Sequence, residues 1–329
     1  GTQTCRKLPS NISTCMMQPD CARISAMQTD QSAHDSEPSW VPESLSTANV
    51  AIWGIGLMGG SLAMALRGKT ASLFGIDPDE QVCRQANEMQ LFDRVSTRPA
   101  ELLPEANFII LCAPLGLIPD LLRQISLHHP GHAVVMDIGS TKNNILPIME
   151  ELPERFIPIG GHPMSGKEVS SLSNADSNLY QGGSFALLAL NRTTPAASKL
   201  AVQLVESIGA HPVWLDPLEH DRWASAISAL PYLVANCLSG VTPLEAAPLV
   251  GPGYKSTTRL AAENINMMHY ILGNNRENVI ADLKNFHARL ELIENALEKD
   301  DFEALSILFE EGAARRAAIM DSFQKGGKS

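Results

Sequence analysis

The sequence predicts an α/β protein in which a doubly wound, mostly parallel sheet is followed by an all-helical domain. Three observations lead to this prediction. Between residues 49 and 215, short apolar runs alternate with helical patterns, as in sheets covered by helices on both faces. A glycine-rich turn joins the first apolar run to the first helical pattern. After residue 216 the strand signals stop, and the rest of the chain has helical periodicity.

The composition excludes several classes of protein. The chain has 329 residues, of which 44% are hydrophobic. This length accommodates about two domains with cores of their own, and the apolar content is too high for a disordered protein. Its 36 acidic residues outnumber its 25 basic ones, giving a net charge of −11. We therefore expect a small-molecule substrate and no nucleic-acid or membrane partner, because an acidic protein repels their phosphates.

The chain divides into three parts by its composition and hydrophobic pattern. Residues 1–46 are rich in Ser, Thr, Gln, Asp and Pro without apolar periodicity, which predicts a disordered tail. Residues 47–216 form the predicted sheet domain and residues 217–329 the helical domain. No early stretch has the pattern of a signal peptide, and the six cysteines form no C-x-x-C pair. We therefore expect a cytoplasmic protein with neither a disulfide framework nor a metal site.

Seven apolar runs are predicted to be strands. In chain order they span residues 50–53, 72–76, 108–112, 134–138, 156–159, 185–190 and 212–215.

The helices of the second half are predicted from helix-breaking residues and from apolar residues that recur every three or four positions. Breaks are expected at Pro231, at residues 242–243 and at residues 251–253. Residues 224–241 carry little charge but contain Ser, Pro, Asn and Gly, which favours a buried helix over a membrane span. Two apolar stripes follow, and either a subunit interface or packing within the chain would produce them. They comprise Ile280, Leu283, Phe286, Leu290, Ile293 and Leu297, and then Phe302, Leu305, Leu308 and Phe309.

The glycine-rich turn has the G-x-G-x-x-G pattern of a Rossmann-type dinucleotide site. Gly54 permits a tight turn, Gly56 lets the backbone approach a pyrophosphate, and Gly59 lets helix and strand pack closely. The N-terminus of the following helix, expected over residues 61–67, offers N–H groups to the phosphates. The predicted cofactor-binding residues are Gly54, Ile55, Gly56, Leu57, Met58 and Gly59, with Asp77 and Pro114 at the ends of later strands.

Asp77 decides which dinucleotide is expected. It closes the second strand, 18 residues after Gly59. A carboxylate there accepts hydrogen bonds from the ribose hydroxyls of NAD and repels the 2′-phosphate of NADP. We therefore predict NAD as the cofactor. The competing interpretation makes the glycines an ordinary turn and Asp77 the N-cap of the helix after Pro78.

Two polar segments follow later strands, where doubly wound sheets bind their ligands. They are Asp137–Lys142 and Gly160–Gly166. Oxidising an alcohol by hydride removal requires a base that titrates near neutral pH, and His162 is the best-placed histidine. Ser140 can hydrogen-bond the reacting hydroxyl or the nicotinamide, and Lys142 can add positive potential as a substrate-binding residue. A helix N-cap and a loop histidine are the competing interpretations of Ser140 and His162.

These motifs together resemble those of the prephenate/arogenate dehydrogenases of tyrosine biosynthesis. The resemblance covers residues from about 49 to about 300 and is carried by GIGLMGGSLA at 54–63, D-x-G-S-x-K at 137–142 and GGHPMSG at 160–166. It implies a nucleotide-binding domain, a C-terminal helical dimerisation domain and a homodimer. It also implies NAD-dependent oxidative decarboxylation of prephenate to 4-hydroxyphenylpyruvate, or of arogenate to tyrosine, without a metal.

The resemblance also implies roles for individual residues. His162 matches the catalytic histidine that accepts the hydroxyl proton, and Ser140 the serine that bonds the hydroxyl. Arg259 matches the arginine that binds the ring carboxylate, a role suited to a planar guanidinium. Ser228 begins the segment that the family writes S-H-L-P-H, but here it is Ser-Ala-Leu-Pro-Tyr, so Tyr232 replaces a histidine. This departure leaves open whether prephenate or arogenate is preferred.

Two other classes of protein remain as alternatives. A β-hydroxyacid dehydrogenase also joins a dinucleotide domain to a helical one, but the K-x-x-x-N spacing of its catalytic lysine is absent after Gly253. A regulatory protein that binds NAD without catalysis would have no use for Ser140, His162 and Arg259 together.

Overall fold

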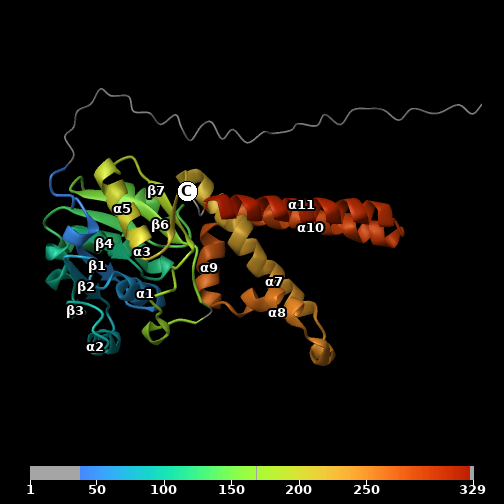
Figure 1. Ribbon diagram of the computed structural model, residues 1–329, viewed down its shortest axis with the longest axis horizontal. Helices are drawn as coiled ribbons and strands as arrows, with labels where there is room; N and C mark the ends of the chain where they lie inside the picture. Colours follow the sequence, from blue (N-terminus) through green and yellow to red (C-terminus); the bar gives the residue numbers. More distant parts are fainter. Residues whose placement is uncertain (1–37, 168, 327–329) are drawn as a thin grey trace, which may run out of the picture. The chain divides into compact units, whose positions relative to one another are not determined.

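The structure is a computed structural model that describes residues 38–167 and 169–326. Within these residues one sheet of eight strands has the order β3-β2-β1-β4-β5-β6-β7-β8 (Figure 1). Its strands are β1 (Asn49–Trp53), β2 (Ser72–Ile76), β3 (Arg94–Ser96), β4 (Phe108–Leu111), β5 (Ala133–Asp137), β6 (Phe156–Pro163), β7 (Ser184–Ala189) and β8 (His211–Trp214). All neighbouring strands are parallel except β6 and β7, which confirms the predicted mostly parallel sheet.

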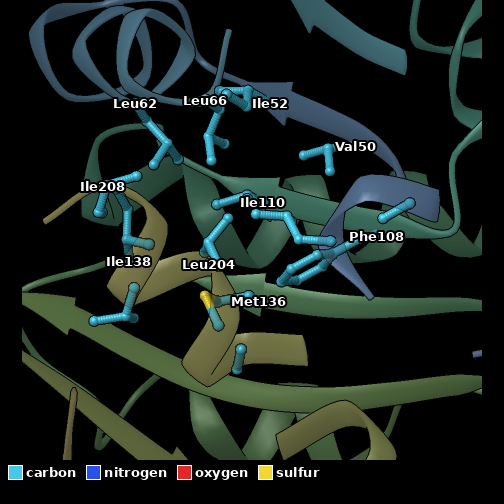
Figure 2. Packing of buried hydrophobic residues seen from close by; sticks show 14 of the residues in the cluster. Val50, Ile52, Leu62, Leu66, Phe108, Ile110, Met136, Ile138, Leu204 and Ile208 are labelled. Atoms are coloured by element: carbon cyan, nitrogen blue, oxygen red, sulfur yellow. The ribbon is translucent and has the colours of Figure 1, made fainter. Parts of the chain in front are cut away.

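Helices cover both faces of this sheet. Side chains alternate along β1: Ile52 belongs to the buried cluster that contains Leu62 and Leu204, whereas its neighbour Trp53 belongs to the cluster that contains Ile118. Figure 2 shows the first cluster, in which strand and helix side chains interdigitate. The helices of this half are α1 (Leu57–Leu66), α2 (Glu80–Glu88), α3 (Ile118–His128), α4 (Leu146–Glu150) and α5 (Pro195–Ser207).

All seven predicted strands are present, but two strand features differ from the prediction. β3 was not predicted, because Arg94–Ser96 is a three-residue edge strand with no apolar run. β6 continues four residues beyond the predicted end at Ile159, since Gly160–Pro163 pair with the antiparallel strand β7. His162, expected in a loop, therefore lies inside a strand.

The prediction of a disordered tail is wrong for its last residues, and residues 1–37 lie outside the described part of the chain. Val41 and Leu45 are buried in the core cluster that includes α5. The backbone N–H of Leu45 donates to Gln203 Oε1 at 2.8 Å. These two apolar side chains and one part-buried hydrogen bond hold residues that resemble a linker by composition alone.

The helical half begins with a long, continuous helical run. α6 (Pro217–Ala224), a π-helical turn η6 (Ser225–Ala229) and α7 (Leu230–Val241) follow one another directly. The predicted break at Pro231 is wrong, because the π turn just before it accommodates a residue that lacks an N–H. The later elements are η7 (Leu244–Leu249), α8 (Pro252–Thr258), η8 (Arg259–Ala262), α9 (Ile265–Asn274), α10 (Arg276–Glu298) and α11 (Phe302–Gly326).

Much of the apolar surface of these helices is exposed in the single chain. Among the described residues, the run Pro217–Val241 is the one helix that could cross a membrane by length and composition, a test that core helices of soluble proteins also pass. Only 22% of its most apolar window is buried, so the predicted buried helix is wrong for the isolated chain. The predicted stripes lie on α10 and α11, which pack side by side (Figure 1), yet Leu290 and Phe309 remain 46% and 58% exposed.

The glycine turn gives a paired prediction. A Cβ at Gly59 would overlap the carbonyl oxygen of Gly54, whereas a Cβ at Gly56 would meet nothing within 4 Å. We expect Gly59→Ala to lower the free energy of unfolding by about 2–3 kcal/mol, the usual cost of overpacking. Gly56→Ala should unfold like the wild type but bind NAD at least roughly tenfold more weakly, about 1.4 kcal/mol. Urea unfolding measures the stability of both variants, and fluorescence titration with NADH measures their affinity for the cofactor. Equal losses of stability in Gly59→Ala and Gly56→Ala would contradict the different roles of the two glycines.

Candidate active site

The candidate site lies where the parallel strands end. Trp53, Ile76 and Leu111 are the last residues of β1, β2 and β4, and Trp53 is in register with both of the others. Asp137, the last residue of β5, pairs with Gly160 of β6. The segments that follow these positions therefore meet at one edge of the sheet, and they contain most of the residues predicted to carry function.

The glycine turn forms an open cradle in front of a helix. Gly54 has φ +102°, a left-handed conformation suited to glycine, and a Cβ there would lie 2.7 Å from the carbonyl oxygen of Cys112. Gly56 is the N-cap of α1, which starts at Leu57, four residues before the predicted start. The first N–H groups of α1 therefore follow directly on the open position at Gly56, an arrangement that suits a pyrophosphate.

Asp77 and Pro114 flank this cradle. Asp77 is half-buried, and its Oδ2 accepts a hydrogen bond from the Ile55 N–H at 2.8 Å. The N-cap of α2 is Asp79, whose carboxylate accepts from Gln81, so the competing role predicted for Asp77 belongs to a different residue. Pro114 is exposed just after Cys112 and Ala113, the residues that lie against Gly54.

A fully buried ion pair stands behind the site. The Lys142 ammonium pairs with Asp137 Oδ2, which also accepts the Gly139 N–H at 2.9 Å, and both charged side chains are 0% exposed. Burial lowers the pKa of Lys142 below its ordinary value, although the charge of Asp137 opposes the shift. This ammonium is enclosed and already paired with Asp137, and the role of Lys142 in binding substrate stays a prediction. Ser140, between the two, is half-buried.

His162 is a buried imidazole held by a second histidine. It is 7% exposed, and its Nδ1 lies 2.9 Å from Nε2 of His220. Burial, followed by the neighbouring His220 and Lys142, holds the pKa of His162 well below 6.5. The ring is therefore neutral near pH 7, and a neutral imidazole can accept a proton from an alcohol.

The sequence reasoning missed His220 and Asp221 on α6. His220 Nδ1 lies 2.7 Å from Asp221 Oδ1, and the Asp221 carboxylate also accepts the backbone N–H groups of Lys142 and Asn143 at 2.8 and 2.9 Å. Adjacent histidine and aspartate residues just after the last strand were the only signal in the sequence, and it is a weak one. The structure thus joins His162 to a carboxylate 59 positions along the chain through one intervening ring.

The remaining predicted site residues lie in the helical half, which follows the last strand of the sheet in the sequence. Ser228 is exposed in the π turn, and Tyr232 is half-buried one turn later on α7. Arg259 is exposed at the start of η8, which packs against α7. The three residues therefore belong to a contiguous group of packed elements, whereas Ser140 and His162 belong to the sheet edge.

Comparison with known proteins agrees with this division. Residues 62–214 match the family model of the prephenate dehydrogenase nucleotide-binding domain, and residues 216–311 match the model of its dimerization domain. The prephenate dehydrogenase of Bacillus subtilis is 27% identical over 271 residues, covering 78% of this chain and 72% of that protein.

Two solved structures are similar over most of the chain. Prephenate dehydrogenase from Aquifex aeolicus, in complex with hydroxyphenyl propionate and NAD+, gives a TM-score of 0.76 at 28% identity, covering 84% of this chain and 99% of that one. Synechocystis arogenate dehydrogenase gives 0.72 at 25% identity, covering 82% and 99%. With both domain models matched in order, the chain belongs to the prephenate dehydrogenase family.

Proposed function

We propose that this protein is an NAD-dependent dehydrogenase that converts prephenate to 4-hydroxyphenylpyruvate by oxidative decarboxylation, a step of tyrosine biosynthesis. The observation that carries this proposal is the neutral, buried His162 at the same sheet edge as the glycine cradle, in a chain with both domains of the family. A base and a dinucleotide site at one edge are what the oxidation of an alcohol requires.

The described residues fit NAD. The open position at Gly56 and the N-terminus of α1 would hold the pyrophosphate, and Asp77 would hold the ribose hydroxyls. Asp77 is followed by Asp79 and Glu80, and these charges disfavour the additional phosphate of NADP. When bound, NAD supplies the hydride acceptor.

The chain's own residues then provide proton transfer and binding. His162 takes the proton of the ring hydroxyl, and Ser140 hydrogen-bonds the same oxygen. As the carbon loses hydride, the oxygen's electrons form a ketone that is conjugated with the ring double bonds next to the carbon that carries the carboxylate. Carbon dioxide leaves because the electrons of its carbon–carbon bond complete the aromatic ring. The ketone oxygen then becomes a phenolate and takes back a proton. Arg259 binds the ring carboxylate, and Ser228 and Tyr232 lie on the elements that pack next to it.

Arogenate is the second candidate substrate. Tyr232 offers a hydroxyl where the family's S-H-L-P-H segment has a histidine, so that position adds no cation for the pyruvyl carboxylate of prephenate. Arogenate carries its own ammonium group beside that carboxylate. The similarity to Synechocystis arogenate dehydrogenase supports testing both compounds.

The exposed helices support a homodimer. Apolar side chains on α10 and α11, together with the half-exposed run Pro217–Val241, would be covered by a second copy, as the name of the matched dimerization domain suggests. We also propose that the two domains divide at Asp216, the N-cap of α6, and that the enzyme works in the cytoplasm.

The central test follows NADH formation and carbon dioxide release with NAD and either prephenate or arogenate. We expect turnover with release of carbon dioxide from at least one of them. His162→Asn should lower kcat by roughly 10²- to 10⁴-fold, the usual contribution of a general base, while NADH still binds. Turnover of simple 3-hydroxyacids alone, or cofactor binding without any turnover, would refute the proposal.

The pH dependence follows from the lowered pKa of His162. The protonated ring is inactive, so kcat/KM should be lost only as the pH falls through a pKa well below 6.5. An ordinary histidine with a pKa of about 6.5 would leave about half of the enzyme active at pH 6.5. We therefore expect kcat/KM at pH 6.5, measured at constant ionic strength, to be clearly more than half of its plateau value. A midpoint of the kcat/KM profile at or above pH 6.5 would contradict the assignment of His162 as the base.

Arg259 is expected to act in binding. Arg259→Ala should raise KM for the ring substrate by roughly 10- to 100-fold, equivalent to losing a charge-assisted hydrogen bond of about 1.5–3 kcal/mol. Arg222→Ala, a change at an exposed arginine of α6, is the matched control and should leave KM unchanged. A KM for Arg259→Ala equal to that of the wild type would remove the residue from the site.

A further inference from the structure

A buried hydrogen-bonded row connects the sheet edge to the helical half. It runs from His162 on β6 through His220 to Asp221 on α6, with nitrogen–nitrogen and nitrogen–oxygen distances of 2.9 and 2.7 Å. The three residues are 7%, 2% and 1% exposed. None of the sequence motifs contains His220 or Asp221, and the reaction described above uses neither.

With His220 neutral, the carboxylate end of this row determines which ring nitrogens carry the protons. Burial alone would raise the pKa of Asp221, but the hydrogen bonds from His220, Asn143 and Lys142 outweigh it and lower the pKa below its ordinary value. Asp221 is therefore ionised and can only accept hydrogen bonds. A neutral His220 must then carry its proton on Nδ1, the nitrogen that faces Asp221, which leaves Nε2 as an acceptor.

The same argument fixes the tautomer of His162. Because Nε2 of His220 is an acceptor, Nδ1 of His162 must carry the proton that joins the two rings. The unprotonated nitrogen of His162 is then Nε2. An isolated imidazole has two neutral tautomers. The row selects the one in which the unprotonated nitrogen, Nε2, is not the nitrogen that faces His220.

From this geometry we propose that His220, held by Asp221, is a positioning residue for His162. It fixes the orientation and tautomer of the His162 ring and stabilises the positive charge that forms when Nε2 takes up the hydroxyl proton. His220 is the hydrogen-bond partner that the described residues provide for the His162 ring. The inference rests on the proposed function, since it needs a reaction in which His162 is the base.

The surroundings explain why such support matters. The charged and titratable groups around His162 are Lys142 from the loop after β5, paired with Asp137, and His220 with Asp221 from α6. Burial, a charged His220 and Lys142 all oppose a positive charge on His162, so His220 supports that charge only as a neutral ring bonded to Asp221. The positive charge that forms on His162 during proton transfer therefore needs a stabilising negative charge. Asp221 supplies it, because its carboxylate is joined to the His162 ring through the hydrogen bonds of His220.

Two substitutions at His220 separate positioning from mere packing. Glutamine can accept the His162 proton with its amide oxygen and donate to Asp221 with its amide nitrogen, whereas leucine fills space without hydrogen bonds. We expect His220→Leu to lower kcat by roughly 10²-fold or more, and His220→Gln to retain within about tenfold of wild-type kcat, since it keeps the hydrogen bonds. KM for the substrate and the dissociation constant of NADH should stay within about twofold of the wild type, because binding is left intact.

A third variant removes the carboxylate that orders the row. In Asp221→Asn, an amide nitrogen in place of Oδ1 would donate to Nδ1 of His220, which would place protons on Nε2 of both histidines and leave His162 without its base. The same nitrogen can no longer accept the Lys142 N–H, which shares Oδ1 with His220, so the thermal stability of this variant is measured beside its kcat. We expect kcat to fall roughly 10²- to 10⁴-fold, as it does when a catalytic histidine is held in the wrong tautomer. This variant also serves if His220→Leu does not fold.

The matched control is His129→Gln. His129 is also a buried histidine, 2% exposed, and hydrogen-bonds the Ala106 carbonyl at 2.7 Å near the opposite ends of β4 and β5. It should lose thermal stability but keep its kcat. Wild-type turnover is measured first, so its absence would refute the proposed function itself. If the wild type is active, two results would overturn the inference. One is an unchanged kcat in His220→Leu or in Asp221→Asn. The other is a loss of kcat, substrate binding and NADH affinity that is equal in both His220 variants.

Discussion

The buried carboxylate of Asp221 is the interaction on which the arrangement of the site depends. A carboxylate that is 1% exposed is costly unless its oxygens are hydrogen-bonded, and here the ring of His220 and the backbone N–H groups of Lys142 and Asn143 all donate to it. Its own backbone carbonyl accepts from the side chain of Asn275, next to the start of α10. One residue thus connects the loop after β5, the first helix of the second half and the start of a long helix.

A second buried charge lies behind the first and has a different role. Asp137 and Lys142 neutralise each other within the same loop, so both charged side chains can be buried while the backbone N–H group of Lys142 donates to Asp221. The cost of removing one member of such a pair is large, because the other charge would remain buried and unpaired. The polar framework behind His162 therefore combines an ion pair within one loop, Asp137 with Lys142, and a carboxylate, Asp221, that is hydrogen-bonded by groups from two segments. Within the described residues, Asp137 Oδ1 is buried without a hydrogen-bond partner.

The sequence was informative where local chemistry decides the structure. The glycine turn, its strand and helix and the position of His162 at the sheet edge follow from the needs of a tight turn and from the way parallel strands end together. It was less informative where partners come from distant segments. Nothing local indicates that Lys142 faces inward to Asp137, that His220 reaches His162, or that Val41 and Leu45 pack on α5. The π turn before Pro231 likewise depends on how the helix packs, so a proline rule alone misplaces a break there.

His162 stands within a strand, paired opposite Ala186 of β7, rather than in a flexible connection. Its backbone is therefore fixed by the ladder to β7, while Ser228, Tyr232 and Arg259 are carried by helices that share no strand with it. In the proposed reaction, proton transfer and substrate recognition are thereby assigned to separate parts of the fold. On that proposal, substitutions on the helices can alter which ring compound is accepted while the proton acceptor stays in place, so a lineage can shift substrate preference without rebuilding its catalyst.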